Sequence, residues 1–329
     1  MRAIRLHQYG PPEELRLEEG LPDPVPGPGR LLVAVEASGV QFVETQVRAG
    51  RMAGTPMAPA GLPWTPGREV GGVVLAAGDA AAAGLVGRRV AGQTQASGGY
   101  ADRALLAVAD AHLLPDTLDT GDAVSLLGTG RTAVGLVEVG AIGKGDTVLV
   151  ESAAGAVGAL VLQLARAAGA QRVIGLAGGE AKLQVVRRFG ADAAVDYTRP
   201  GWAEQVRALA PDGVDVALAS VGGEISRNSF ELLARGGRFV VFGSSGGEPA
   251  PIGPEQAADR GITVTQYFGP PVGPRSPENQ RRQTVEALTA AAEGRLRPFV
   301  GRRFPLAEAA AAHRAIESRQ TVGKTLLVP

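Results

Sequence analysis

The sequence predicts an α/β protein that combines a doubly wound parallel sheet with a second, β-rich domain. The chain has 329 residues, which is long for one hydrophobic core and suits two domains. From about residue 126 onward, short apolar strands alternate with helical patterns, as they do in a parallel sheet with helices on both faces. Before about residue 123, short strands follow one another between Gly/Pro turns without that alternation.

The clearest element is a strand, a turn and a helix between Gly145 and Gly169. The run Asp146-Thr-Val-Leu-Val-Glu151 is β-branched and apolar, which predicts a buried strand. A turn of small residues follows (152–158), and apolar residues then recur at helical spacing until Gly169. The free N–H groups and the dipole of a helix N-terminus favour an anion, and small residues let a pyrophosphate approach. The stretch is therefore typical of the first half of a dinucleotide-binding unit.

The glycine pattern of this turn is incomplete. In the motif G-x-G-x-x-G the first position is Ala153, so that only Gly155 and Gly158 are in register. A tightly packed turn without a ligand is the alternative. The strand before the turn, the helix after it and the intact alternation downstream favour nucleotide binding.

The remaining elements follow from the same patterns. In the first domain we expect strands at 2–6, 31–37, 70–77 and 88–91 and an extended proline-rich loop at 22–29. In the second we expect helices at 129–139, 180–189, 202–209 and 225–233 and strands at 172–177, 193–196, 214–219, 238–242 and 262–265. Gly190 and Gly236-Gly237 are expected at helix ends. A loop at 270–277, helices at 277–292 and 306–318 and a strand at 324–328 return the chain to the first domain.

Composition excludes several classes of function. Lys+Arg and Asp+Glu both number 33, so no global charge attracts nucleic acid or an anionic membrane. The absence of cysteine removes disulfides, thiolate nucleophiles and cysteine-ligated zinc. His7, His112 and His313 lie far apart, without metal-ligand spacing. Residues 1–6 lack the apolar core of a signal peptide and no apolar run has the length of a membrane span, so we expect a cytoplasmic protein.

The end of the second predicted strand bears on the choice of nucleotide. NAD-specific sites carry an acid there, for the ribose hydroxyls, whereas this chain has Gly175-Leu-Ala-Gly178. Lys182 follows, and Tyr197 closes the third strand. A cation and a phenol suit a 2′-phosphate, which favours NADPH. The alternative for Lys182 is a solvated helix lysine. We expect the ligand cleft between the domains, at the carboxyl ends of the parallel strands.

The stretch 145–158 resembles the corresponding turn of the zinc-free, zeta-crystallin-like quinone oxidoreductases of the medium-chain dehydrogenase/reductase superfamily. The resemblance covers nearly the whole chain, in order. Further matching stretches are 37–50, Pro66-Gly-Arg-Glu-Val-Gly-Gly-Val-Val74, Gly98-Gly-Tyr-Ala-Asp102, Val221-Gly-Gly223, Phe242-Gly-Ser-Ser-Gly246 and Val322-Gly-Lys-Thr-Leu-Leu327.

The resemblance implies a GroES-like catalytic domain at 1–123 and 268–329 and a Rossmann domain at 124–267 that binds NADPH. It places the pyrophosphate over the turn and the 2′-phosphate at Lys182 and Tyr197, with help from Arg319. The cofactor-binding residues that we expect are Thr132, Ala154, Gly155, Ala156, Val157, Gly178, Lys182, Tyr197, Val221, Phe242, Gly243, Ser244 and Arg319.

Two residues depart from the family pattern in the acceptor pocket. Gln41 stands where relatives usually have Asn, and Gln46 where they commonly have Tyr. Tyr can stack on a quinone, whereas Gln can only hydrogen-bond, so the substrate class is open. Gln41, Gln46 and Thr132 are the pocket candidates that could donate to a developing oxyanion. Tyr100 and Tyr267 are possible acids, but structural roles are the alternative for both.

The family implies metal-free hydride transfer from NADPH to a quinone or an α,β-unsaturated carbonyl. Two alternatives stay open: a pathway-specific enoyl or enone reductase, and a non-catalytic NADPH-binding protein of a crystallin-like or sensor type. Ile262-Thr-Val-Thr265 alternates apolar and polar residues, carries no charge and is expected at the edge of the Rossmann sheet. Because such an edge invites pairing, and relatives join two of them, we expect a homodimer.

Overall fold

A computed structural model describes residues 1–94, 97–249, 252–268 and 273–329 and divides the chain into two compact units. The first unit is Met1–Gly128 with Leu288–Pro329, and the second is Thr129–Ala287. The second unit thus continues through most of helix α8 (Pro277–Ala292), beyond the family-implied boundary at residue 268. Of the predicted loop at 270–277, residues 270–272 lie outside the described residues.

The second unit is built on six parallel strands, in the order β10-β9-β8-β11-β12-β13. Counted along the chain this order is 3-2-1-4-5-6, that of the Rossmann fold, so the predicted fold class is confirmed. The strands are β8 (Thr147–Val150), β9 (Arg172–Ala177), β10 (Ala193–Asp196), β11 (Val214–Ala219), β12 (Leu233–Val241) and β13 (Thr263–Gln266).

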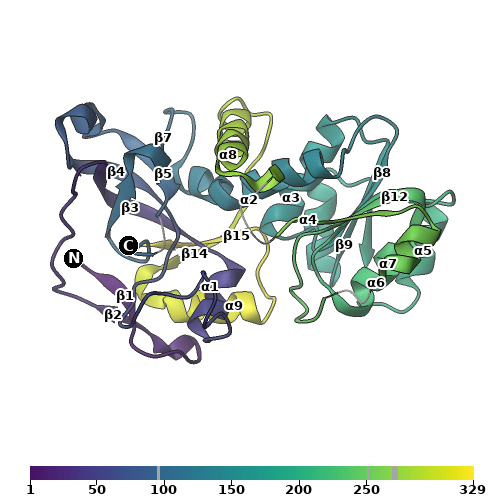
Figure 1. Cartoon of the computed structure of the whole chain (residues 1–329), viewed down its shortest axis with the longest axis horizontal. Coiled ribbons are helices and arrows are strands. Elements are labelled where there is room, and N and C mark those ends of the chain that lie inside the picture. The colour runs from purple at the N-terminus through teal and green to yellow at the C-terminus, as the bar shows by residue number, and fades with distance from the viewer. Residues whose placement is uncertain (95–96, 250–251, 269–272) are drawn as a thin grey trace. The chain divides into compact units, whose positions relative to one another are not determined.

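Helices cover both faces of this sheet (Figure 1). On one face Trp202, Phe230 and Ala257 share a core cluster with strand residues such as Ile174. Successive residues of a strand point to opposite faces of the sheet, so Gly175, next to Ile174, faces the other side. There it lies against residues of helices α3 and α4. The helices with residues in this unit are α2 (Thr120–Val139), α3 (Ala156–Ala167), α4 (Glu180–Arg188), α5 (Trp202–Leu209), α6 (Gly223–Glu231), α7 (Pro254–Asp259) and α8.

The first unit is β-rich, as predicted. Its seven-stranded sheet has the order β14-β15-β3-β4-β5-β7, with β6 paired to β3, and β1 pairs with β2. The C-terminal strand β15 lies between β14 and β3, which ties the end of the chain to its beginning (Figure 1). Helices α1 (Phe42–Arg48) and α9 (Ala309–Glu317) pack together. The strands are β1 (Ala3–Leu6), β2 (Leu15–Glu18), β3 (Arg30–Val40), β4 (Glu69–Ala77), β5 (Arg89–Gln93), β6 (Arg103–Ala107), β7 (Ala111–Leu113), β14 (Val300–Pro305) and β15 (Lys324–Val328).

Helix α2 begins nine residues before the predicted start at 129. Asp119 explains the early start, because its Oδ1 accepts hydrogen bonds from the N–H groups of Gly121 (2.9 Å) and Asp122 (3.2 Å). An aspartate in this position satisfies donors that the first turn leaves free. In the described part of the chain no helix is long and apolar enough to cross a membrane.

The prediction that Gly236-Gly237 ends a helix was wrong. Helix α6 ends at Glu231, and both glycines lie inside β12. The pairing with β11 jumps from Leu233 to Arg238, and Gly236, with φ +75°, bulges out to donate to Arg260 O at 2.9 Å. Glycine suits this bulge because other residues rarely adopt a positive φ. Helices α1 and α7 are seven and six residues long and were not predicted.

Candidate functional site

The two glycines in the turn between β8 and α3 have different surroundings. Gly158 is closed in, because a Cβ there would lie 2.5 Å from Ser152 O and 2.7 Å from the Cα of Ala153. Gly155, the N-cap of α3, is less confined, since a Cβ there would make one tight contact, with Ser152 O at 3.1 Å, and no other within 4 Å. Gly158 therefore permits tight packing of helix on turn, and Gly155 leaves room above it.

Ala153 stands where the motif has its first glycine, and a glycine on the neighbouring strand β9 makes room for its methyl group. Ala153 is fully buried, and its N–H donates to Leu176 O at 2.9 Å. A Cβ on Gly175 would lie 2.9 Å from the Cβ of Ala153 and collide with Val186. The space for the Ala153 methyl group therefore comes from a glycine on β9.

The first turn of α3 offers hydrogen-bond donors at this opening. Ala154, Gly155, Ala156 and Val157 bring the chain into the helix, and the N–H groups of a first turn have no partner within their own helix. Ser152 holds the left-handed conformation with φ +49°, a strain that sharp turns at functional sites store. Small residues, free donors and the helix dipole together fit a pyrophosphate.

Glu151 is a site residue that the sequence reasoning missed. It directly follows β8, where the strand order reverses, and its Oε2 accepts from the N–H groups of Ser220 and Val221 (both 2.8 Å) and from Ser226 Oγ (2.7 Å). Burial raises the pKa of the Glu151 carboxyl, and these hydrogen bonds oppose the rise. The carboxyl binds the turn after β11 to the end of β8. A lone acid at the end of an apolar strand was the available signal.

The predicted residues Val221, Phe242, Gly243 and Ser244 come together at the ends of β11 and β12. Phe242 N donates to Ala219 O at 2.9 Å. Two residues of the loop after Phe242 also donate backbone hydrogen bonds to the turn after β11, the second of them to Val221 O at 2.7 Å. The pairing continues past the strands, so these four residues lie at the carboxyl edge of the sheet, where ligands of this fold bind.

Gly178, Lys182 and Tyr197 lie around the ends of β9 and β10. A Cβ on Gly178 would lie 3.7 Å from Tyr197 Cε2, and Lys182 is half-buried in the first turn of α4. Asp196 ends the neighbouring strand, and its carboxylate accepts from Thr198 N (3.0 Å) and Oγ1 (2.6 Å). Slight burial raises the pKa of Asp196, but the Thr198 hydrogen bonds and others outweigh it and lower the pKa.

Two further predicted residues lie on different units. Thr132 is half-buried on α2 in the second unit. Arg319 follows α9 in the first unit, exposed, with φ +56°. Their contacts with one cofactor stay a prediction.

Gln41 is the N-cap of α1, and two buried carboxylates lie close to it. Its backbone N–H donates to Glu44 Oε2 at 2.9 Å. A Cβ placed on Gly128 would lie 3.0 Å from Gln41 Nε2 and collide with Glu69 Oε1, so the amide and the second carboxylate face the same spot. Glu69 also binds Lys324 Nζ at 2.5 Å, with both side chains buried. Gln46 is half-buried on the same helix.

The Tyr100 hydroxyl is committed to internal partners. It donates to Glu44 Oε2 at 2.9 Å and lies 3.1 Å from His313 Nε2, and all three residues are buried. Burial raises the pKa of Tyr100 well above its usual value and raises the pKa of Glu44, and it lowers the pKa of His313 to about 3. His313 is therefore neutral at pH 7.

Tyr267 also has a structural role. Its ring is buried, its hydroxyl donates to Gln283 Oε1 at 3.4 Å, and it packs against the bare backbone of Gly135. Burial raises the pKa of this phenol as well. Neither tyrosine is presented as an acid to a ligand.

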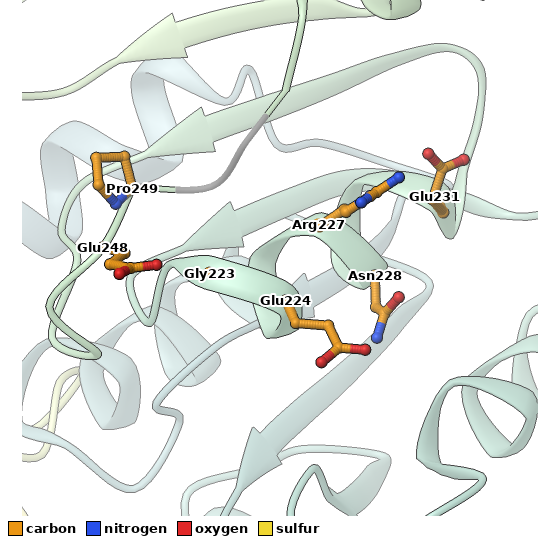
Figure 2. Close-up of a pocket in the computed structure, with 7 residues that line it drawn as sticks. All are labelled: Gly223, Glu224, Arg227, Asn228, Glu231, Glu248 and Pro249. Atoms are coloured by element: carbon orange, nitrogen blue, oxygen red, sulfur yellow. The ribbon is translucent and has the colours of Figure 1, made fainter.

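A cavity of about 610 Å³ lies beside α6 (Figure 2). It is lined by the helix between Gly223 and Glu231 and by Glu248 and Pro249. None of the predicted site residues lines it, although Gly223 follows Val221 by two positions. Among the described residues, no three His, Asp or Glu side chains gather as metal ligands would.

Comparison with known proteins agrees with this architecture. Residues 27–116 match the family described as alcohol dehydrogenase GroES-like domain, and residues 156–288 match that described as zinc-binding dehydrogenase. The quinone oxidoreductase of Sus scrofa is 32% identical over 335 residues, which cover 100% of this chain and 98% of the relative.

Two solved structures cover the full length of both chains. A mycobacterial protein complexed with NADPH is 34% identical with a TM-score of 0.88. The Escherichia coli quinone oxidoreductase complexed with NADPH is 27% identical with a TM-score of 0.87. Full-length identity above 30% to the curated relative, together with both matched domains, shows that this chain belongs to the quinone oxidoreductase family of the medium-chain dehydrogenase/reductase superfamily.

Proposed function

We propose that the protein is an NADPH-dependent oxidoreductase that transfers a hydride to a quinone or an α,β-unsaturated carbonyl without a metal ion. The observation that carries the proposal is the open turn at Gly155, which lies where the strand order of a Rossmann sheet reverses. Relatives of this fold were solved with NADPH.

The chain's own residues fit this nucleotide. The N–H groups at the start of α3 would hold the pyrophosphate, and Gly155 leaves the approach free. Lys182 and Tyr197 would hold the 2′-phosphate, since residues 175–178 carry no acid that would repel it. Glu151 keeps the turns after β8 and β11 in place.

NADPH, when bound, supplies the hydride. The Gln41 amide and the Thr132 hydroxyl are the candidate donors to the oxygen that gains negative charge. The hydroxyls of Tyr100 and Tyr267 are engaged inside the protein, so neither is assigned as the proton donor. A chain without cysteine cannot form a cysteine-ligated zinc site.

Two other functions have specific support. Gln41 and Gln46, which differ from the residues usual in the family, favour a pathway-specific enoyl or enone reductase. The same two residues keep a non-catalytic NADPH-binding protein, crystallin-like or sensor-like, as a further candidate.

The test combines NADPH oxidation with a panel of quinones and enones and a fluorescence titration of NADPH. Turnover of a quinone or enone, unchanged by chelators and without stoichiometric zinc by metal analysis, is the expected result. Tight NADPH binding without turnover of any acceptor would support the binding protein instead. Loss of turnover with chelators would overturn the metal-free assignment.

A further inference from the structure

The carboxyl of Glu151 fixes three consecutive N–H groups in the turn after β11. Its Oε2 accepts directly from Ser220 N and Val221 N, both at 2.8 Å. The third N–H reaches it through a hydroxyl, because Gly222 N donates to Ser226 Oγ at 2.8 Å and Ser226 Oγ donates to Glu151 Oε2 at 2.7 Å. Glu151 is 1% exposed, so its carboxyl acts through these segments of the chain and does not touch a ligand.

The turn that Glu151 holds is bonded to the loop after β12. Ser220 O accepts from Ser245 N at 2.9 Å. Val221 O accepts from Gly246 N at 2.7 Å. One buried carboxyl therefore supports two loops at the carboxyl ends of β11 and β12. We call these two segments, residues 220–223 and 243–248, the β11–β12 loops.

The strand order indicates which half of the nucleotide these loops receive. In a Rossmann sheet the two halves of a dinucleotide lie on either side of the point where the strand order reverses. Here that point is β8, with β9 and β10 on one side and β11 and β12 on the other. The adenosine ribose belongs at the end of the second strand, β9. The nicotinamide half then belongs at the β11–β12 loops.

A different acid supports the adenosine side. Asp196, the last residue of β10, accepts from Thr198 N at 3.0 Å and from Thr198 Oγ1 at 2.6 Å. The N–H of Gly179, the N-cap of α4, also bonds to this carboxylate. Asp196 thus joins the ends of β9 and β10, as Glu151 joins the ends of β8 and β11. The two sides of the nucleotide site have separate supports.

Building on the proposed function, we infer that Glu151 is a positioning residue for the nicotinamide half of NADPH. It keeps the β11–β12 loops in the conformation that receives this half, so NADPH does not have to order them when it binds. Ordering loops and side chains on binding lowers affinity. Without Glu151 this cost falls on a ligand that reaches the β11–β12 loops, and a ligand confined to the adenosine side is spared.

The test compares the affinities of NADPH and of 2′,5′-ADP, which has the adenosine half and lacks the nicotinamide half. Glu151→Leu removes the acceptor and leaves the N–H groups of residues 220 and 221 without it. The Kd of NADPH should rise about tenfold or more, because buried donors then lack a partner. The Kd of 2′,5′-ADP should change by less than about twofold. Isothermal titration calorimetry measures both values, and a thermal melt shows that the variant is folded.

Three further variants sharpen the test. Glu151→Gln keeps a carbonyl oxygen that can accept from the same donors, so it should restore most of the NADPH affinity. Asp196→Ala is the matched control on the other side of β8 and should weaken both ligands by a similar factor. Ser226→Ala breaks only the link from Gly222 to Glu151 and should weaken NADPH alone, by a smaller factor. It replaces Glu151→Leu if that variant does not fold.

The outcomes separate the inference from the proposed function. Equal losses for the two ligands in folded Glu151→Leu overturn the inference, and so does an NADPH affinity that neither Glu151→Leu nor Ser226→Ala changes. In both cases the NADPH site itself stands. A wild-type protein that binds neither NADPH nor 2′,5′-ADP overturns the proposed function, and the inference with it.

Discussion

Lys182 carries the nucleotide preference that we propose. Its side chain is half-buried in the first turn of α4, next to a strand end that lacks an acid. Lys182→Ala removes a charged donor to the 2′-phosphate, so the binding free energy of NADPH should weaken by about 1.5–3 kcal/mol while that of NADH hardly changes. Fluorescence titration of both nucleotides measures this, with the exposed Lys144→Ala as a matched control. Equal losses for the two nucleotides would refute the assignment.

His313 makes the stability of the first unit sensitive to acid. Its pKa is about 3 in the folded protein and about 6.5 when unfolded, so between these values the unfolded state binds more protons. The contribution of neutral His313 is complete above about pH 6.5. Below it, the free energy of unfolding falls by up to about 1.4 kcal/mol per pH unit from this group.

His313→Gln tests this sensitivity, because Gln does not titrate and its amide can still donate to Tyr100. Urea unfolding at several pH values measures the free energy of unfolding of both proteins. Between about pH 9 and about pH 7, above the pKa of an unfolded histidine, the difference between wild type and variant should stay constant. Below about pH 6.5 wild type should lose stability relative to the variant. A difference that stays constant down to about pH 4.5 would show that burial does not keep His313 neutral.

At the level of single elements, the two glycines of the β8–α3 turn have different roles: we expect Gly155 to matter for nucleotide binding and Gly158 for the stability of the fold. Gly155→Val should abolish NADPH binding while the protein folds, because a side chain there meets only Ser152 O and then fills the phosphate's approach. Gly158→Val is the contrast, since its Cβ would lie 2.5 Å from Ser152 O and should cost stability. Thermal melts and NADPH titration of both variants measure the two effects. Unchanged NADPH affinity in folded Gly155→Val would exclude this turn as the phosphate site.

At the scale of the whole molecule, the edge strand β13 predicts how two copies associate. It is the outer strand of the Rossmann sheet, carries no charge, and leaves Val264 38% exposed. Such an edge has free N–H and C=O groups that invite pairing. We therefore expect a homodimer in which two edges meet across a two-fold axis.

Val264→Pro should release monomers, because proline removes a ladder donor and does not fit a paired strand. Val264→Thr keeps the backbone donor and serves as the control. Light scattering at micromolar concentration, with a thermal melt to show that the proline variant is folded, measures the outcome. A wild-type monomer, or a proline variant that stays dimeric, would rule out this interface.

Much of the fold follows from local patterns. The bounds predicted for β9, β10, β11, α5 and α8 agree with the structure, because their apolar spacing is regular and glycines or turns bound them. Short elements were missed for the opposite reason: α1 has seven residues, too few for a periodic pattern. The bulge at Gly236 was read as a helix end, because a positive φ suits both.

Local patterns are enough to predict the Rossmann alternation, the β-rich first unit, the glycines of the turn and the lack of an acid at the end of β9, because these features depend on neighbouring residues. Features that depend on contacts between distant residues came only from the folded chain. The folded chain shows that Gly175 makes room for Ala153, that Glu151 binds the turn after β11, and that the Tyr100 hydroxyl donates to Glu44. A side chain's partners are set by packing, and no local pattern encodes them.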